Sequence, residues 1–448
     1  MAKATAPTRR RRLLVGAAPA LAAAAAACRA GPEPPARAGP TAAAGRVEFW
    51  YGLNVDGVQP FVDDFKREFP NVHLEFVPTT DHASKLYTAS AAGAAPNVST
   101  GWPAMLWTIE PAVQLLDDAI KGDRDLKRDN YWPNYWDFHK FKGKLSMLPM
   151  QANNRLVFYD KAVLDEYAIP EPRSWDDFRR AARTLTRREG ANVARWGYQC
   201  EPNVAGLRTT VGPWANRNGF VGWDRDVRRS GWGEPPMLET VEFLLALIHD
   251  DGSMTNPLDN PVPGGIQGGM PKGLAAMVSA GPPGGLGFIQ QLPRLERDQQ
   301  GFLHLPGPRV KESYLIGGGQ DLILFKTAQG NDQKAALELM RYLGFTRNVE
   351  YCKHNRTVYP AVKAAANDPY FAGGIWKAMW TNWNETKVPP HPTGVPVPES
   401  DDAINPILTA IFRKERNPRE GLQEIARLLN AAAAQRRPEI DAFLKAGG

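Results

Sequence analysis

Cysteine is scarce in this chain: there are three residues among 448, at positions 28, 200 and 352. No two of them stand at the short spacing of a zinc or redox motif. Cys200 and Cys352 can form a disulfide only if the fold brings them together, and two separate buried thiols are the simpler expectation. The seven histidines are scattered along the chain. The sequence therefore predicts no metal site and gives no indication of a cofactor.

The common signatures of catalysis and nucleotide binding are missing as well. Neither H-E-x-x-H, G-x-S-x-G, a Walker A sequence nor G-x-G-x-x-G occurs. Three pairs of aspartates stand at predicted helix ends, where capping explains them better than catalysis does. We therefore expect a protein that is not an enzyme. A glycosidase needs only two carboxylates across a cleft, so a secreted carbohydrate-active enzyme stays open as an alternative.

The folded part of the chain has no excess of charge of one sign. The formal net charge is +6, from 54 basic and 48 acidic residues. Lys3 and Arg9 to Arg12 lie before residue 28 with no acid among them, so 49 basic residues face 48 acidic ones in the remainder. A nucleic-acid-binding domain carries a basic patch on its folded surface. The charge pattern therefore predicts no nucleic-acid partner.

A long run of small apolar residues follows these N-terminal cations, from residue 13 to residue 27. This order is that of an export signal, and the run is too short and too rich in alanine for a membrane-spanning helix. Arg10-Arg11 resembles a twin-arginine signal. Ala25-Ala26-Ala27-Cys28 resembles a lipobox, with alanine where leucine is usual at its first position. Residues 1–28 are predicted as an export signal with lipidation at Cys28, and residues 29–45 as a flexible tether.

The folded part begins with a strand, a helix and a second strand. Residues 46–51 and 72–77 are apolar and β-prone, and residues 61–69 place phenylalanines and a valine at helical spacing. The order predicts parallel strands joined by a right-handed crossover. Ligands of such sheets bind beyond the carboxyl ends of the strands. The segment from Tyr51 to Asn54 is therefore predicted at a ligand-binding edge.

Residues 143–178 have the most ordered pattern in the chain. A glycine turn opens the segment, and the strand-like residues after it stop at Pro149, which cannot donate to a sheet ladder. Residues 156–159 form a continuous apolar run, as in a strand buried on both faces. Asp160 and Ser174 each precede a predicted helix, as N-cap residues do.

These motifs resemble those of the extracellular solute-binding proteins of ABC importers, the group that includes the maltose-binding proteins. The resemblance rests on Gly143-Lys144-Leu145 with Pro149, on Tyr159-Asp160-Lys161, and on the PRSWDDF sequence of residues 172–178, all at matching spacing. Weaker matches extend it over about residues 46–365.

The resemblance implies an α/β fold of the type II periplasmic-binding-protein class. Two lobes are expected, each a mixed, mostly parallel sheet flanked by helices, with a ligand cleft between them. Lobe 1 is predicted to hold residues 46–150 and about 303–348. Lobe 2 is predicted to hold residues 151–302 and about 349–448.

The resemblance also suggests which residues meet the ligand. Asn153 follows Pro149, where family members place a polar contact, and Trp214 stands in a region that often supplies stacking aromatics. Trp102 is a stacking candidate in a loop, although packing beneath the next helix explains it equally well. A glycine run lets the backbone approach a ligand or turn sharply. The predicted ligand-binding residues are Tyr51, Asn54, Trp102, Asn153, Trp214, Gly318 and Arg356.

The functional prediction is an exported, membrane-anchored lipoprotein that binds a sugar, an oligosaccharide or a polyol. It would deliver this ligand to the transmembrane subunits of an ABC permease. We expect a monomer that faces either a periplasm or a cell surface. Besides a glycoside-hydrolase-like enzyme, a surface lipoprotein without a role in transport stays open.

Overall fold

The structure is a computed structural model, and residues 42–448 form one compact unit. The predictions for the export signal, the tether and Cys28 lie outside the described residues. The structure describes residues 43–152, 156–200, 207–259, 261–263, 266–280, 300–303, 307–308, 313–314, 321–356, 358–372, 376–377, 386–387 and 401–445.

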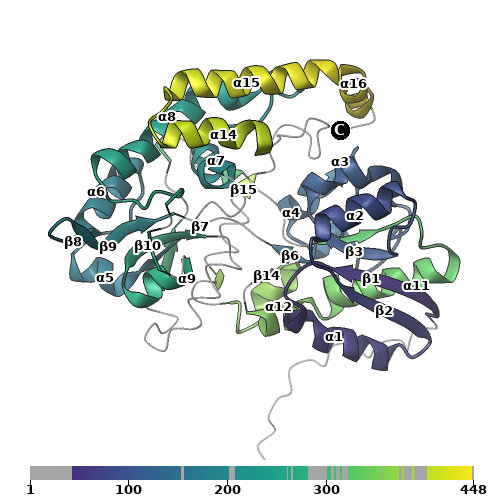
Figure 1. The fold of residues 1–448 in the computed structure, drawn as a ribbon. Helices are drawn as coiled ribbons and strands as arrows, with labels where there is room; N and C mark the ends of the chain where they lie inside the picture. The colour runs from purple at the N-terminus through teal and green to yellow at the C-terminus, as the bar shows by residue number, and fades with distance from the viewer. Residues whose placement is uncertain are drawn as a thin grey trace, which may run out of the picture. The chain divides into compact units, whose positions relative to one another are not determined.

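The first sheet has the strand order β13-β3-β1-β2 (Figure 1). Its strands are β1 (Gly45–Tyr51), β2 (Val72–Pro78), β3 (Val98–Gly101) and β13 (Asp321–Leu324). Strand β1 pairs in parallel with β2 and with β3, as the strand-helix-strand pattern predicted. Strand β13 returns from far along the chain and pairs antiparallel with β3. The helices associated with this sheet include α1 (Val55–Glu68), α2 (His82–Ala91), α11 (Gly330–Arg341) and α12 (Asn348–Asn355).

The second sheet has the strand order β11-β7-β10-β9-β8. Its strands are β7 (Leu156–Asp160), β8 (Arg187–Glu189), β9 (Asn192–Gln199), β10 (Ala275–Ala280) and β11 (Gln300–Leu303). Only β9 and β10 pair in parallel, while the other three pairings are antiparallel. The sheet is mixed as predicted, but the expectation of mostly parallel strands does not hold for it. A β8-β9 hairpin and the return of β11 onto β7 supply the antiparallel pairs.

The ordered segment around residues 143–178 folds largely as predicted. All five residues of β7 are buried. Asp160 caps α5 (Lys161–Glu166), because its carboxylate accepts a hydrogen bond from the Ala162 N–H at 3.0 Å. Ser174 caps α6 (Trp175–Leu185) and accepts from the Asp177 N–H at 3.1 Å. Local signals therefore set both helix starts.

Shorter elements and the C-terminal helices complete the fold. The remaining helices are α3 (Leu106–Ile109), α4 (Pro133–Phe138), α7 (Leu207–Arg217), α8 (Pro235–Leu245), α9 (Ile266–Gly269), α14 (Asp401–Phe412), α15 (Pro418–Gln435) and α16 (Arg437–Lys445). The short strands are β4 (Lys140–Phe141), β5 (Lys144–Leu145), β6 (Gln151–Ala152), β12 (Ser313–Tyr314), β14 (Tyr359–Pro360) and β15 (Thr386–Lys387). A π-helical turn, η8 (Tyr342–Thr346), joins α11 to α12.

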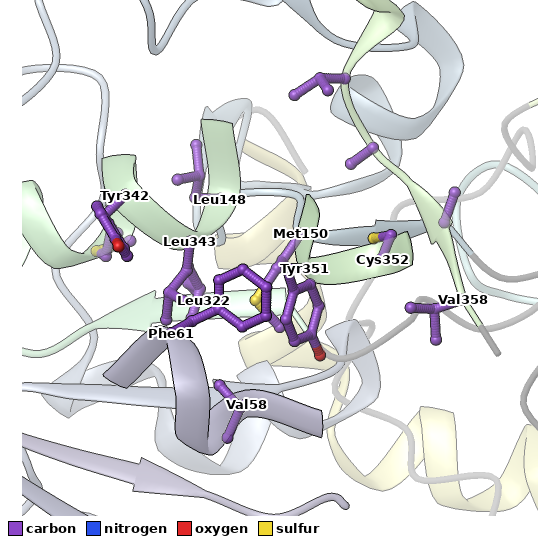
Figure 2. Packing of buried hydrophobic residues seen from close by; sticks show 14 of the residues in the cluster. Val58, Phe61, Leu148, Met150, Leu322, Tyr342, Leu343, Tyr351, Cys352 and Val358 are labelled. Atoms are coloured by element: carbon purple, nitrogen blue, oxygen red, sulfur yellow. The ribbon is translucent and has the colours of Figure 1, made fainter. Parts of the chain in front are cut away.

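The large apolar cluster around the first sheet extends beyond that sheet. Tyr351, Tyr359 and Trp376 belong to the same cluster as Phe49 and Phe61, and Figure 2 shows Tyr351 beside Phe61. The cluster also contains residues of β7 and β10 in the second sheet. Helix α12 packs on α1 of the first sheet region, whereas α14 and α15 pack in the other large cluster with the second-sheet helices. The boundaries of the two lobes stay a prediction.

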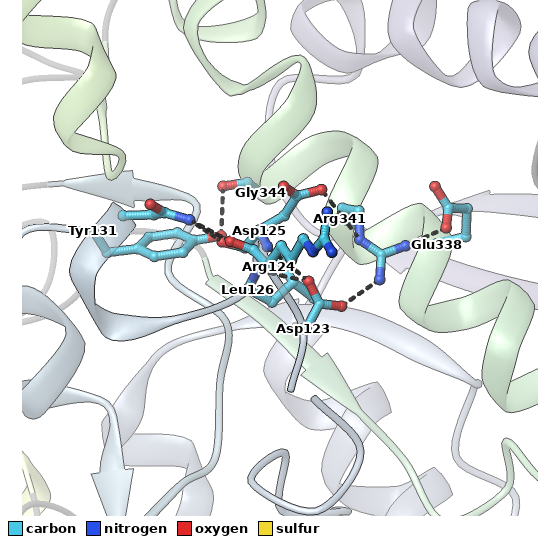
Figure 3. A network of polar contacts seen from close by, with 9 residues as sticks. Asp123, Arg124, Asp125, Leu126, Tyr131, Glu338, Arg341 and Gly344 are labelled. Atoms are coloured by element: carbon cyan, nitrogen blue, oxygen red, sulfur yellow. Dashed lines mark hydrogen bonds and ion pairs between the residues drawn. The ribbon is translucent and has the colours of Figure 1, made fainter. Parts of the chain in front are cut away.

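Lobe 1 also contains an ion-pair network around Arg341 of α11 (Figure 3). The guanidinium of Arg341 pairs with Asp123 and with Glu338. Burial alone would raise the pKa of Asp123, but the N–H of Leu126 and the Arg341 guanidinium outweigh it and lower that pKa. The nearby Tyr131 hydroxyl donates to the Gly344 carbonyl at 3.2 Å. These contacts tie the loop before α4 to the α11–η8 helix.

Candidate functional site

Three parallel strands end at one edge of the first sheet. Strand β1 ends at Tyr51, β2 at Pro78 and β3 at Gly101. The N–H of Thr79 donates to the Tyr51 carbonyl at 2.9 Å, so the loop after β2 is bonded to the end of β1. The N–H of Gly52 donates to the Thr100 hydroxyl at 3.2 Å. The carboxyl edge is therefore held together by hydrogen bonds between its loops, at the side of the sheet where ligands of such folds bind.

His82, the first residue of α2, connects the loops at this edge. Its Nε2 lies 2.8 Å from the Thr100 carbonyl oxygen and 3.2 Å from the Ser99 hydroxyl, while Nδ1 lies beside the Thr79 hydroxyl. Since a carbonyl only accepts, Nε2 carries the proton and Nδ1 accepts from Thr79. Burial lowers the pKa of His82, against the opposing effect of the Thr100 hydrogen bond. The imidazole therefore acts as a neutral connector.

Gly52 is required for this arrangement. A Cβ on residue 52 would lie 2.4 Å from Cγ of the His82 ring, which is far inside van der Waals contact. Only a residue without a side chain lets the backbone after β1 pass this close to the imidazole.

Behind the edge lies a buried hydroxyl pair. The Tyr51 hydroxyl is 3.0 Å from the Tyr351 hydroxyl of α12. The Tyr351 hydroxyl also accepts from the side-chain amides of Gln151 and, at 3.4 Å, of Asn355. Burial raises the pKa of Tyr51 to about 12, although the hydrogen bond with Tyr351 opposes it. Both tyrosines therefore stay protonated, and they join the end of β1 to β6 and α12.

The structure places three of the predicted ligand-binding residues where a solute can reach them. Asn54 is exposed at the start of α1, and its side chain makes no capping hydrogen bond. Trp102 is half-buried directly after β3 and packs on one side against an apolar cluster. Arg356 is exposed and ends α12 in the left-handed conformation, with φ of 60°. Asn153 and Gly318 lie outside the described residues.

The other two predicted contacts are inside the protein. Tyr51 is fully buried, and Trp214 is 1% exposed in the core of the second lobe. The Trp214 ring packs edge-on against Phe178 and Tyr198, and its indole N–H donates to the Tyr198 hydroxyl at 3.2 Å. Neither ring presents a face for stacking in this structure.

Sequence reasoning missed three residues that organise the edge: His82, Gln151 and Tyr351. His82 looked like one of several scattered histidines, because its partners Thr79 and Thr100 come from different loops. Gln151 belongs to none of the motifs described above. The burial of Tyr51 had a signal, since Val47, Phe49 and Tyr51 alternate along one strand.

The described residues hold neither a metal-binding cluster nor a membrane-spanning helix. No group of three or more His, Cys, Asp or Glu side chains there is arranged to hold a metal ion. Within the same residues, every helix is too short or too polar to cross a bilayer. Cys200 and Cys352 are both buried and unpaired, which confirms the expectation of two separate thiols.

Two mixed sheets flanked by helices, with crossings between them, define the type II periplasmic-binding-protein fold. Comparison with family models agrees: residues 51–349 match the model described as bacterial extracellular solute-binding protein. This chain belongs to that family.

This chain aligns with nearly the whole length of several solved structures that have the same fold. MalE, a sugar-binding protein from Xanthomonas citri, superposes with a TM-score of 0.76 at 19% identity, over 89% of this chain and 99% of MalE. MalE from Bdellovibrio bacteriovorus bound to maltotriose gives a TM-score of 0.70 at 16% identity, over 88% of this chain and 100% of that one. UgpB from Mycobacterium tuberculosis in complex with glycerophosphocholine gives 0.72 at 17% identity, over 88% and 99%.

A curated relative, the multiple sugar-binding protein of Streptococcus mutans, is similar over a shorter stretch. It is 25% identical over 122 residues, which is 27% of this chain. The match spans 28% of the length of that relative.

Proposed function

We propose that this protein is the substrate-binding component of an ABC importer and that its ligand is a carbohydrate or a related polyol derivative. The observation that carries the proposal is the polar carboxyl edge of the first sheet, in a member of a solute-binding family. Similar structures hold maltotriose and glycerophosphocholine, which are both polar molecules with free hydroxyl groups. The ligand would bind in a cleft between the lobes, which would close around it by a hinge motion.

The proposed ligand contacts differ in their roles. Trp102 would stack one face on a sugar ring, while Asn54 would hydrogen-bond hydroxyl groups. Arg356, Asn153 and Gly318 remain proposed contacts. Tyr51 and Trp214 would act from behind the surface, because their rings are buried.

The proposal also includes the export of the protein and its location at a membrane. Export through the N-terminal signal and lipidation of Cys28 would anchor the chain at the outer face of a membrane, in a periplasm or at a cell surface. A monomer in this position would offer its closed, loaded form to the permease. Catalysis is not part of the proposed role.

A thermal-shift screen of the purified protein tests the ligand class. The compounds are maltose, maltotriose, sucrose, polyols, sugar phosphates and glycerophosphocholine. A ligand at 100 times its dissociation constant adds about 2.7 kcal/mol to the folded state. We expect one hydroxyl-rich class to raise the melting temperature by several degrees and to be recovered unchanged. Recovery of a hydrolysed product would favour the enzyme alternative, and the absence of any shift would count against this ligand class.

Two tryptophan variants test the site with the active compound. Trp102→Ala should weaken binding by more than about 1 kcal/mol, as truncation of a tryptophan that carries binding energy does. The matched control is Trp50→Ala. Trp50 is also half-buried against the same cluster, but its indole N–H donates to Glu48 at 2.6 Å on a neighbouring part of β1. Equal losses in the two variants would contradict the assignment of Trp102.

A further inference from the structure

Asp321, the first residue of β13, is a fully buried acid. It contacts the segment in which the chain passes from the first sheet to the second. Its Oδ2 lies 2.6 Å from Nε2 of His139, which is also fully buried. Its Oδ1 accepts from the Met150 N–H at 2.8 Å and lies 3.4 Å from the Gln151 nitrogen. The Tyr135 hydroxyl lies 3.1 Å and 3.2 Å from the two carboxylate oxygens. An ionised acid in this position is tolerated only if its charge is balanced.

His139 provides that balance. Its Nδ1 lies 2.6 Å from the Tyr135 carbonyl oxygen, while its Nε2 faces Asp321. A carbonyl only accepts, and so does an ionised carboxylate. Both hydrogen bonds can therefore form only if the pair holds two protons between the ring and the carboxyl group. With two protons the pair is neutral overall, which removes most of the cost of burying it.

The pair belongs to a set of side chains that bond every polar backbone group of Met150 and Gln151. Asp321 accepts from both N–H groups. The side-chain amide of Asn348 donates to the Met150 carbonyl at 2.8 Å, and the Tyr135 hydroxyl donates to the Gln151 carbonyl. Secondary structure usually satisfies such groups with other backbone groups. Here side chains from α4, β13 and α12 do so beside the short backbone pairing of β6 with β14.

These two residues stand where the chain leaves the first sheet region for the second. Met150 and Gln151 precede β7 of the second sheet by only a few residues. The Gln151 side chain donates to the Tyr351 hydroxyl, which meets Tyr51 at the end of β1. One unbroken series of hydrogen bonds thus runs from Asp321 through the crossing to the carboxyl edge of the first sheet.

We propose that Asp321, held by His139, is a positioning residue for ligand capture: it fixes the start of the interlobe crossing relative to the ligand-binding edge. Its effect on ligand binding rests on the proposed function, while its effect on the crossing does not. The crossing must transmit closure of one lobe onto the other, and a closed form needs a defined starting geometry at this point. Asp321 touches no ligand in this scheme.

Hydrogen–deuterium exchange without ligand tests the positioning role directly. Asp321→Leu removes the acceptor, and Tyr135→Phe removes the donor to the Gln151 carbonyl together with the Tyr135 contact to the Asp321 carboxylate. We expect amide exchange in residues 150–152 to accelerate at least tenfold in Asp321→Leu and less in Tyr135→Phe, while β1 and β2 exchange as in wild type. Asp321→Asn keeps an acceptor for Met150 and can donate to a His139 ring protonated at Nδ1, so it should restore most of the protection. If Asp321→Leu does not fold, the other two variants still test the proposal. Exchange in residues 150–152 should accelerate in Tyr135→Phe and stay close to wild type in Asp321→Asn.

The matched control is Tyr131→Phe. Tyr131 is a second fully buried tyrosine of the same region, but its hydroxyl donates to Gly344 rather than to the crossing. It should leave exchange in residues 150–152 unchanged. Equal acceleration in Tyr131→Phe, or no acceleration in any folded variant of Asp321 and Tyr135, would overturn the proposal.

Titration calorimetry with maltotriose separates this inference from the proposed function. We expect Asp321→Leu, at a temperature where it is fully folded, to bind at least tenfold more weakly than Asp321→Asn. Wild-type affinity for maltotriose in a folded Asp321→Leu protein would overturn the link to capture. If wild type does not bind maltotriose, that result counts against a maltodextrin ligand, and hydrogen exchange alone decides whether Asp321 positions the crossing.

Discussion

Removing the Tyr351 hydroxyl should cost far more stability than removing the hydroxyl of its neighbour Tyr359. In wild type the Tyr351 hydroxyl is fully buried and bonds Tyr51 at 3.0 Å and the Gln151 amide. Tyr351→Phe leaves both of these groups buried without that partner. Each such group costs about 1–3 kcal/mol, so we expect a loss of about 2–6 kcal/mol in the free energy of unfolding. The contact with Asn355 is long, at 3.4 Å, and adds little.

Tyr359→Phe is the matched control for this prediction. Tyr359 is fully buried in the same apolar cluster, but its hydroxyl has no hydrogen-bond partner among the described residues. Removing a buried polar group that bonds nothing is neutral or stabilising, by up to about 1 kcal/mol. The pair of variants therefore separates the loss of a hydroxyl from the loss of its hydrogen bonds.

Urea denaturation followed by tryptophan fluorescence and by circular dichroism measures both variants. The slope with urea concentration should stay unchanged, so that the midpoint reports stability. Equal losses in the two variants would refute the reasoning, and so would a loss below about 1 kcal/mol for Tyr351→Phe, the typical net value of one hydrogen bond.

Three further predictions concern the edge and the Arg341 network. His82→Gln should remove a pH dependence of the stability. The folded protein favours neutral His82, so wild-type stability is full above the ordinary pKa of 6.5 and falls as pH drops below it. Parallel plots of melting temperature against pH for the two proteins would contradict this. Gly52→Ala should cost about 1–3 kcal/mol, since the methyl group overlaps the His82 ring, whereas Gly212→Ala, in α7 with open space around it, should cost nothing in thermal melts. Arg341→Met should lower the free energy of unfolding by about 1.5–3 kcal/mol at pH 7, as measured by urea titration. Because the pKa of Asp123 is lowered in the folded protein, this loss should shrink as pH falls below 3.8. A loss that stays constant with pH would count against the ion pair.

Local sequence determined the elements that depend on neighbours in the chain. Apolar, β-prone runs predicted β1 and β2, and apolar residues at helical spacing predicted α1, because both signals depend on neighbouring residues. Capping by Asp160 and Ser174 was equally predictable from the sequence, since a cap bonds an N–H only two or three residues away. The motifs in residues 143–178 also indicated the family and, through the family, the fold.

The tertiary structure alone decided what depends on residues far apart in the chain. The pairing of β13 with β3 and the packing of α12 on α1 rest on contacts across more than a hundred residues. The same holds for the contacts of Asp321 with His139 and Met150, which no local pattern announces. Whether an aromatic ring faces a ligand or the core is likewise a question of packing, and packing buried Tyr51 and Trp214 while it left Trp102 half-exposed. Sequence thus indicated the class of protein, and three-dimensional packing decided which residues lie at the carboxyl edge of the first sheet.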